Sequence, residues 1–113
     1  MLDADRSAHL QACIVDCLEC HSLCRQVAMN HCLEAGGEHV HPEHFRLMDD
    51  CAEICRTAAD FMLSSSSFYP QVCALCAEIC EACARSCESL DGMGVCARAC
   101  RGCAESCGRL AQR

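Results

Sequence analysis

The spacing of the cysteines is the feature that most constrains the fold of this 113-residue chain. Fifteen of its sixteen cysteines fall into four segments, and within each segment successive cysteines are three or four residues apart. The stretch CALCAEICEACARSC (73–87) shows this rhythm most clearly. Steps of three and four return to one face of an α-helix. The spacing therefore predicts helices that each carry a stripe of thiols along one face.

Glycine and proline residues mark the ends of four helical segments. Gly36-Gly37 ends the first segment, while Pro42 and Pro70 suit the first turn of the second and third. No segment shows the alternation expected of a β-strand. Short connections favour antiparallel neighbours, so we expect an all-α, antiparallel up-down-up-down four-helix bundle. The expected helices span about residues 5–34, 42–63, 70–90 and 94–110.

The four stripes predict a cysteine-lined core within a single domain over residues 1–113. When the helices pack, each stripe occupies the seam positions that face the bundle axis. Cys32 lies one residue off its stripe, and it is expected either as a partly exposed thiol at the bundle end or as a further ligand. The candidate metal-binding thiols are Cys13, Cys17, Cys20, Cys24, Cys51, Cys55, Cys73, Cys76, Cys80, Cys83, Cys87, Cys96, Cys100, Cys103 and Cys107.

Two explanations without a metal account poorly for the stripes. Cysteine can fill a core as a small apolar residue, which explains one or two buried cysteines better than fifteen in register. Disulfides within a helix would be strained, because the Cβ atoms are about 5–6 Å apart and a disulfide needs about 3.5–4.5 Å. A reducing cytoplasm would also keep the thiols free, although disulfides between helices can form on exposure to air.

Among metals, Cu(I) fits a continuous ladder of thiolates. Cu(I) is soft, accepts two sulfur ligands, and can share a bridging thiolate with a second ion. Sixteen thiolates carry a charge of −16, which one Cu(I) per cysteine cancels, whereas four Zn²⁺ ions would leave −8 in a dry core. This predicts on the order of fifteen Cu(I) ions per chain. An iron–sulfur redox protein and a zinc-thiolate store remain as alternatives.

Imidazole and thioether side chains gather at one predicted end of the bundle. Extending the stripes to the end of the first and third helices and the start of the second and fourth brings together His31, His44, Met48 and Met93. Both groups are uncharged soft ligands for Cu(I) and hold it less tightly than thiolate does. These four residues are therefore candidates for the place where copper enters.

Charge and hydropathy exclude several other classes of protein. The net charge of −7 argues against nucleic acid as a partner, and no apolar run is long enough for a membrane span. The first residues do not form a secretory signal, so we expect the protein in the cytoplasm. Thiols in a repetitive buried row indicate no enzyme. An apolar flank favours a homo-oligomer; it comprises Ile14, Leu18, Phe45, Ile54, Phe61, Val72, Leu75 and Ile79.

The repeated CxxxC and CxxC pairs, such as Cys13-Cys17 and Cys73-Cys76, carry a resemblance over about residues 8–110. The chain resembles the bacterial cysteine-rich four-helix-bundle copper storage proteins, specifically their cytosolic branch. The resemblance implies a homotetramer of bundles filled with Cu(I), and storage or sequestration rather than catalysis. It also implies a copper chaperone or a recipient cuproprotein as a partner. The second helix has only two cysteines, Cys51 and Cys55, which lowers the expected loading.

Overall fold

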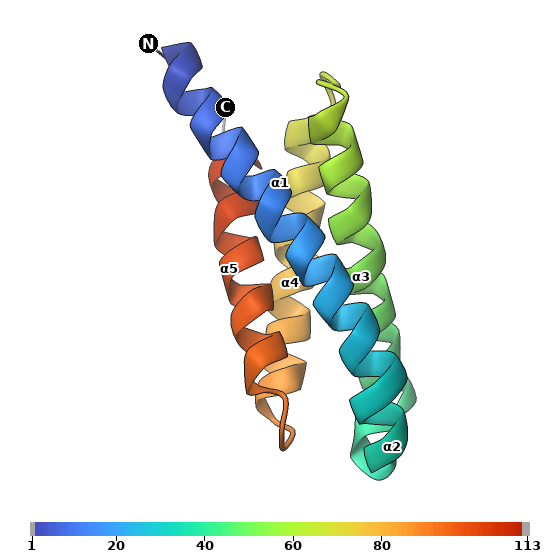
Figure 1. Ribbon diagram of the computed structural model, residues 1–113. Coiled ribbons are helices and arrows are strands. Elements are labelled where there is room, and N and C mark those ends of the chain that lie inside the picture. Colours follow the sequence, from blue (N-terminus) through green and yellow to red (C-terminus); the bar gives the residue numbers. More distant parts are fainter. Residues whose placement is uncertain (1, 112–113) are drawn as a thin grey trace.

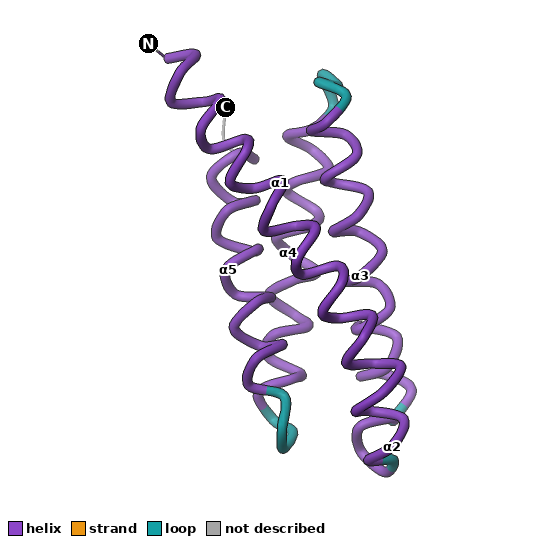
Figure 2. The backbone as a smooth tube through the Cα atoms, in the orientation of Figure 1, coloured by secondary structure: helices purple, strands orange, loops and turns teal. Residues whose placement is uncertain are grey.

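The computed structural model describes residues 2–111 as a rod of 50 × 19 × 18 Å (Figure 1). Nearly all of these residues are helical, and short loops join the helices (Figure 2). None of the helices in this range is long and apolar enough to cross a membrane. The four long helices are α1 (Leu2–Val27), α3 (Pro42–Leu63), α4 (Tyr69–Glu88) and α5 (Gly94–Ala111).

The helices form a ring in which chain neighbours are also neighbours in space. α1 packs against α3 and α5, and α4 packs against the same two helices from the opposite side. This arrangement confirms the predicted antiparallel up-down-up-down bundle. The predicted domain includes residue 1 and residues 112–113, which lie outside the described residues.

The first helix continues past α1 through a wider turn. A π-helical segment, η1 (Ala28–Cys32), follows α1 and leads into the short α2 (Leu33–Ala35). Hydrogen bonds in a π turn run from residue i to i+5, so the turn takes up one more residue than an α turn. Ala28 and Cys32 therefore stay in line with the thiols of α1 and are buried.

At this end one sequence prediction was wrong, that for His31, and one of the two alternatives for Cys32 is excluded. Cys32 has no exposed surface, so it is not the partly exposed thiol, and its role as a further ligand stays a prediction. His31 does not continue the stripe and is exposed to solvent. Both positions have one physical cause, because the π turn rotates the residues after Val27 relative to a regular α-helix.

The connections between helices use glycine and proline as expected. The first helix stops at Gly36, whose φ is +66°, and a 3₁₀ turn, η2 (Gly37–Val40), leads to Pro42 at the start of α3. α4 begins at Tyr69, directly before Pro70.

The turn between α4 and α5 is packed beneath His31. Gly92 in this turn has a φ of +76°, which favours glycine, and a Cβ added there would lie 2.9 Å from the imidazole of His31. Nε2 of His31 also lies 3.4 Å from the carbonyl oxygen of Asp91. The end of the first helix and the α4–α5 turn therefore contact each other at one end of the rod.

We predict that Gly92→Ala destabilises the metal-free protein more than Gly37→Ala does. Both positions have a positive φ, which costs about 1–2 kcal/mol for an L-residue. A Cβ at Gly37 meets no atom within 4 Å, whereas one at Gly92 displaces the His31 ring. Denaturant unfolding of the reduced protein measures both losses. Equal losses would show that the His31 contact does not hold this end together.

Candidate metal centre

All sixteen cysteines lie inside the rod as free thiols. Each has at most 1% of its surface exposed, and all four long helices together with η1 contribute. We call this set the thiol column. The predicted convergence of fifteen stripe cysteines on a common axis is confirmed, and Cys32 joins them at one end.

Neighbouring sulfur atoms in the column are in van der Waals contact without being bonded. The Sγ atoms of Cys13 and Cys107 are 3.5 Å apart, and those of Cys24 and Cys96 are 3.6 Å apart. An S–S bond is only about 2.05 Å long. The column therefore presents closely spaced single sulfur ligands on different helices, which is the arrangement needed for metal ions that bridge helices.

The thiols form overlapping groups rather than separate sites. In each group the sulfur atoms lie within 4.8 Å of one another. Cys107, Cys103 and Cys20 each belong to two groups, so successive groups are joined through a shared thiol. The groups are Cys13–Cys73–Cys107, Cys17–Cys76–Cys103–Cys107, Cys20–Cys55–Cys80–Cys103 and Cys20–Cys24–Cys51–Cys100.

Thioethers follow the thiols at the end of the column near the α4–α5 turn. Sδ of Met48 lies 3.6 Å from Sγ of both Cys83 and Cys87. Sδ of Met93 lies 3.9 Å from Sγ of Cys32. The structure thus brings Met48 and Met93 to the predicted end, and their role as copper ligands stays a prediction.

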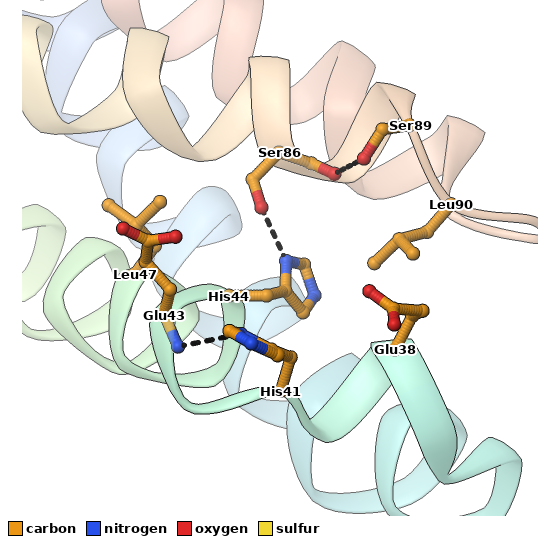
Figure 3. A pocket seen from close by; sticks show the side chains of 8 residues that line it. All are labelled: Glu38, His41, Glu43, His44, Leu47, Ser86, Ser89 and Leu90. Atoms are coloured by element: carbon orange, nitrogen blue, oxygen red, sulfur yellow. Dashed lines mark hydrogen bonds between the residues drawn. The ribbon is translucent and has the colours of Figure 1, made fainter.

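His44 lies between this end of the column and a surface cavity of about 520 Å³. Its Nε2 is 3.8 Å from Sγ of Cys32, and its Nδ1 is 2.7 Å from Oγ of Ser86. Figure 3 shows the ring reaching from α3 toward Ser86 of α4, within the lining of the cavity. Burial lowers the pKa of His44, so the ring is neutral near pH 7. When Nδ1–H donates to Ser86, Nε2 directs its lone pair toward Cys32.

Sequence reasoning left Cys32 open between two alternatives and missed Ser86. Cys32 contacts both His44 and Met93, but no residue type in the sequence marks the π turn that turns it inward. Ser86 directly precedes Cys87 and so flanks the stripe, which was the available signal for its position. His31 stays outside the column, where its ring meets that of His39 edge to face at 5.1 Å.

Burial and thiol–thiol hydrogen bonds shift the pKa values of the column thiols in both directions. The pKa of Cys24 is raised, first by its hydrogen bond with Cys100 and further by burial, and that of Cys55 is raised first by Cys103. The pKa of Cys20 is lowered, because neighbouring thiols, Cys100 first, hydrogen-bond to its thiolate. Binding of a metal at Cys24 or Cys55 must therefore displace a proton that the thiol holds more strongly than in water, whereas Cys20 gives up its proton more readily.

We predict that alkaline pH weakens the metal-free fold through Cys32. Burial raises the pKa of this thiol above its ordinary value of 9.0. A raised folded-state pKa contributes stability that is complete below pH 9 and is lost as pH rises, because the unfolded state loses the proton first. The slope for one proton is at most about 1.4 kcal/mol per pH unit.

The measurement is the unfolding free energy of reduced, metal-free protein between pH 8 and 10, compared with Cys32→Ala. The sequence has nine arginines and no lysine, so no lysine titrates in this range. Wild type should lose stability more steeply than the variant. Parallel curves would contradict the prediction.

The fold and the thiol column define a class, that of helical proteins that bind metal ions through a buried row of thiolates. A family model described as copper storage protein matches residues 6–112. The chain belongs to the copper storage protein family.

Solved structures agree with this assignment. A crystal structure of a protein from Nitrosospira multiformis has a TM-score of 0.92 and 59% sequence identity, covering 93% of this chain and 96% of that one. The Cu(I)-bound copper storage protein BsCsp3 has a TM-score of 0.83 and 39% sequence identity, and the match covers 91% of this chain and 98% of that one. Metal-free copper storage protein 3 from Bacillus subtilis has a TM-score of 0.80 and 40% sequence identity, and the match covers 89% of this chain and 97% of that one.

A curated relative is also similar over part of its length. The cysteine-rich protein YhjQ of Bacillus subtilis (strain 168), described as uncharacterized, is 40% identical over 67 residues, or 59% of this chain. The match spans 61% of that protein, so this chain covers about three-fifths of its length.

Proposed function

We propose that this protein stores Cu(I) as cargo at a loading of roughly one ion per thiol. The sharing of Cys20, Cys103 and Cys107 between groups is the observation that carries the proposal. Closed tetrahedral zinc sites would each need four thiolates of their own, whereas bridging thiolates let one sulfur serve two Cu(I) ions. The similarity to the Cu(I)-bound protein BsCsp3 supports the same metal.

Electrostatics favours a monovalent ion at this loading. The column is dry, and buried charge without a counterion is strongly destabilising. When one Cu(I) replaces one thiol proton, the charge inside the rod does not change. Cu(I) can therefore fill the column without building up charge, while divalent ions bound by four thiolates leave a negative excess at each site.

We predict that anaerobic titration of the reduced protein with Cu(I), against a chromophoric chelator, saturates near fifteen ions per chain. In weakly buffered solution each ion should release about one proton. A zinc store would saturate near four ions and release about four protons per ion. Saturation at three or four Cu(I) ions, or a brown iron–sulfur chromophore in the isolated protein, would contradict Cu(I) storage.

Copper enters, in this proposal, at the end that carries His44, Cys32, Met93 and Met48. The cavity outside His44 gives access from solvent. The distances from His44 to Cys32 and on to Met93 are 3.8 and 3.9 Å, short enough for an ion to move from ligand to ligand. At the opposite end the ring of Tyr69 lies beneath the guanidinium of Arg6, whose Cζ is 5.8 Å from the ring centroid.

His31 has a different place in this scheme from the one expected from the sequence. It lies at the same end of the rod but on the outer surface, against Asp91 and Gly92. We therefore propose His44, Met48 and Met93 as ligands on the path into the column, and no ligand position inside the column for His31.

We predict that the double variant Met48→Leu/Met93→Leu takes up Cu(I) roughly tenfold more slowly while its final capacity stays nearly unchanged. Leucine has a similar volume, so the fold tolerates the exchange, but it offers no sulfur. Met62→Leu is the matched control, because Met62 is equally buried but lies on the last turn of α3. Stopped-flow loading should show slower Cu(I) uptake in the double variant than in Met62→Leu. Equal rates in the double variant and the wild type would contradict this path.

We further propose a homotetramer in the cytoplasm that exchanges copper with a chaperone or a recipient cuproprotein. Large apolar side chains on the outside of the rod support an oligomer: Leu18 is 41% exposed, Leu75 48% and Val15 51%. Free thiols packed at 3.5–4.0 Å require a reducing compartment to stay unoxidised, which supports the cytoplasm.

A further inference from the structure

A second cavity, of about 220 Å³, lies on the side of the rod between α1 and α5. We call it the side groove. Asp16, Glu19 and Cys20 line it from α1, and Gly102 and Cys103 are among its residues on α5. The two other cavities noted along residues 2–111 are not lined by cysteines. The side groove therefore marks a place where the outer surface comes close to the thiol column.

The two cysteines of the side groove occupy a special position in the column. Cys20 belongs to two of the four-thiol groups, and so does Cys103. Both are members of the central group with Cys55 and Cys80. Neither has any exposed surface, so the side groove ends at these two residues and solvent in it does not contact them. A molecule in the side groove would lie against the junction of three four-thiol groups.

Small residues on α5 keep the side groove open. Ala99 and Gly102 line it, and a Cβ added at Gly102 would meet no atom within 4 Å. Gly102 has no positive φ that would call for glycine. Glycine within a helix costs roughly 0.5–1 kcal/mol relative to alanine. The missing side chain leaves room above Cys103 that almost any other residue would fill.

Charges of opposite sign flank this space. Asp16 and Glu19 are carboxylates on α1. Arg98 on α5 also lines the groove, and Nη1 of its guanidinium lies 3.5 Å from the position of a Cβ added at Gly94, one turn back along the helix. Asp16 accepts a hydrogen bond from the hydroxyl of Ser106. Arg98 takes part in none of the ion pairs found among residues 2–111. The side groove can therefore hold an ammonium group and a carboxylate on opposite sides, above buried sulfur.

We propose that the side groove is a port at which a zwitterionic low-molecular-weight thiol withdraws Cu(I) from the middle of the column; free L-cysteine is the simplest such molecule. The inference rests on the proposed storage of Cu(I). The ammonium of the thiol pairs with Asp16 and Glu19, its carboxylate pairs with Arg98, and its sulfur points toward Cys20 and Cys103. Charge complementarity and the small volume select this ligand over a protein.

The transfer is a ligand exchange without a redox step. The sulfur of the incoming thiol forms a bond to Cu(I), and the bond from that ion to Sγ of Cys20 or Cys103 breaks. The proton given up by the incoming thiol passes to the released thiolate. Copper remains Cu(I), and the total charge does not change. A port at mid-column makes these ions available without first emptying the sites nearer the end.

The test measures release of Cu(I) from the saturated full-length protein under anaerobic conditions. Excess free L-cysteine withdraws the metal, a chromophoric chelator collects it, and the rate with the chelator alone is subtracted. Gly102→Leu fills the side groove. Gly108→Leu is the matched control, because Gly108 also lies in α5 with no atom within 4 Å of an added Cβ but does not line the side groove.

Gly102→Leu should slow cysteine-driven release about tenfold, while Gly108→Leu should stay within about twofold of wild type. An unchanged rate in Gly102→Leu, or equal slowing in both variants, would overturn the port. A failure of Cu(I) storage would show earlier and separately, as a low metal content after loading of the wild type.

A second comparison tests recognition of the carboxylate. Cysteamine carries the same thiol and ammonium as L-cysteine but has no carboxylate. The wild type should reach half-maximal release at a concentration of L-cysteine roughly twofold to fivefold lower than that of cysteamine, as expected for one exposed ion pair. Arg98→Gln should remove this difference. A wild type without preference, or a preference that survives in Arg98→Gln, would overturn the proposed role of Arg98.

Discussion

The burial of sixteen thiols along one axis is the constraint on which the rest of the structure depends. A thiolate in a dry interior is costly unless it is hydrogen-bonded or bound to a cation, so most of these thiols must keep a proton or hold a metal ion. The same atoms therefore form the core of the fold and the binding site for the cargo. Few leucine and isoleucine side chains share this core, and the residues between the thiols are mostly alanines such as Ala52, Ala58 and Ala84.

Much of this arrangement could be predicted from the sequence, because a helical stripe is a pattern in one dimension. The steps of three and four residues predicted the inward thiols, and Pro42 marked the start of α3. The π turn at Ala28–Cys32 could not be predicted in this way. It shifts hydrogen bonds within a continuous helix, and no glycine or proline marks its position in the sequence. A single additional residue exchanged the positions expected for His31 and Cys32.

The contacts between helices were also beyond the reach of the periodicity. The hydrogen bond from His44 to Ser86 joins residues 42 positions apart, and the side groove needs Asp16 and Gly102 on the same side of the rod. These neighbours depend on how far each helix is rotated about its own axis. A stripe predicts which face turns inward, but it does not determine which residues meet at the edges of that face.

Sharing of thiols between groups also gives the column its capacity. Separate sites would need a complete ligand set for each ion, and the number of ions would then be limited by the number of sets. Here Cys20, Cys103 and Cys107 join successive groups, so each additional turn of helix extends one continuous site. Met48, Met93 and His44 lie at an end of that site, and in the proposed entry path their uncharged groups would bind Cu(I) less tightly than the thiolates do. In that proposed path, stronger binding in the middle than at the end would make filling of the column favourable from that side.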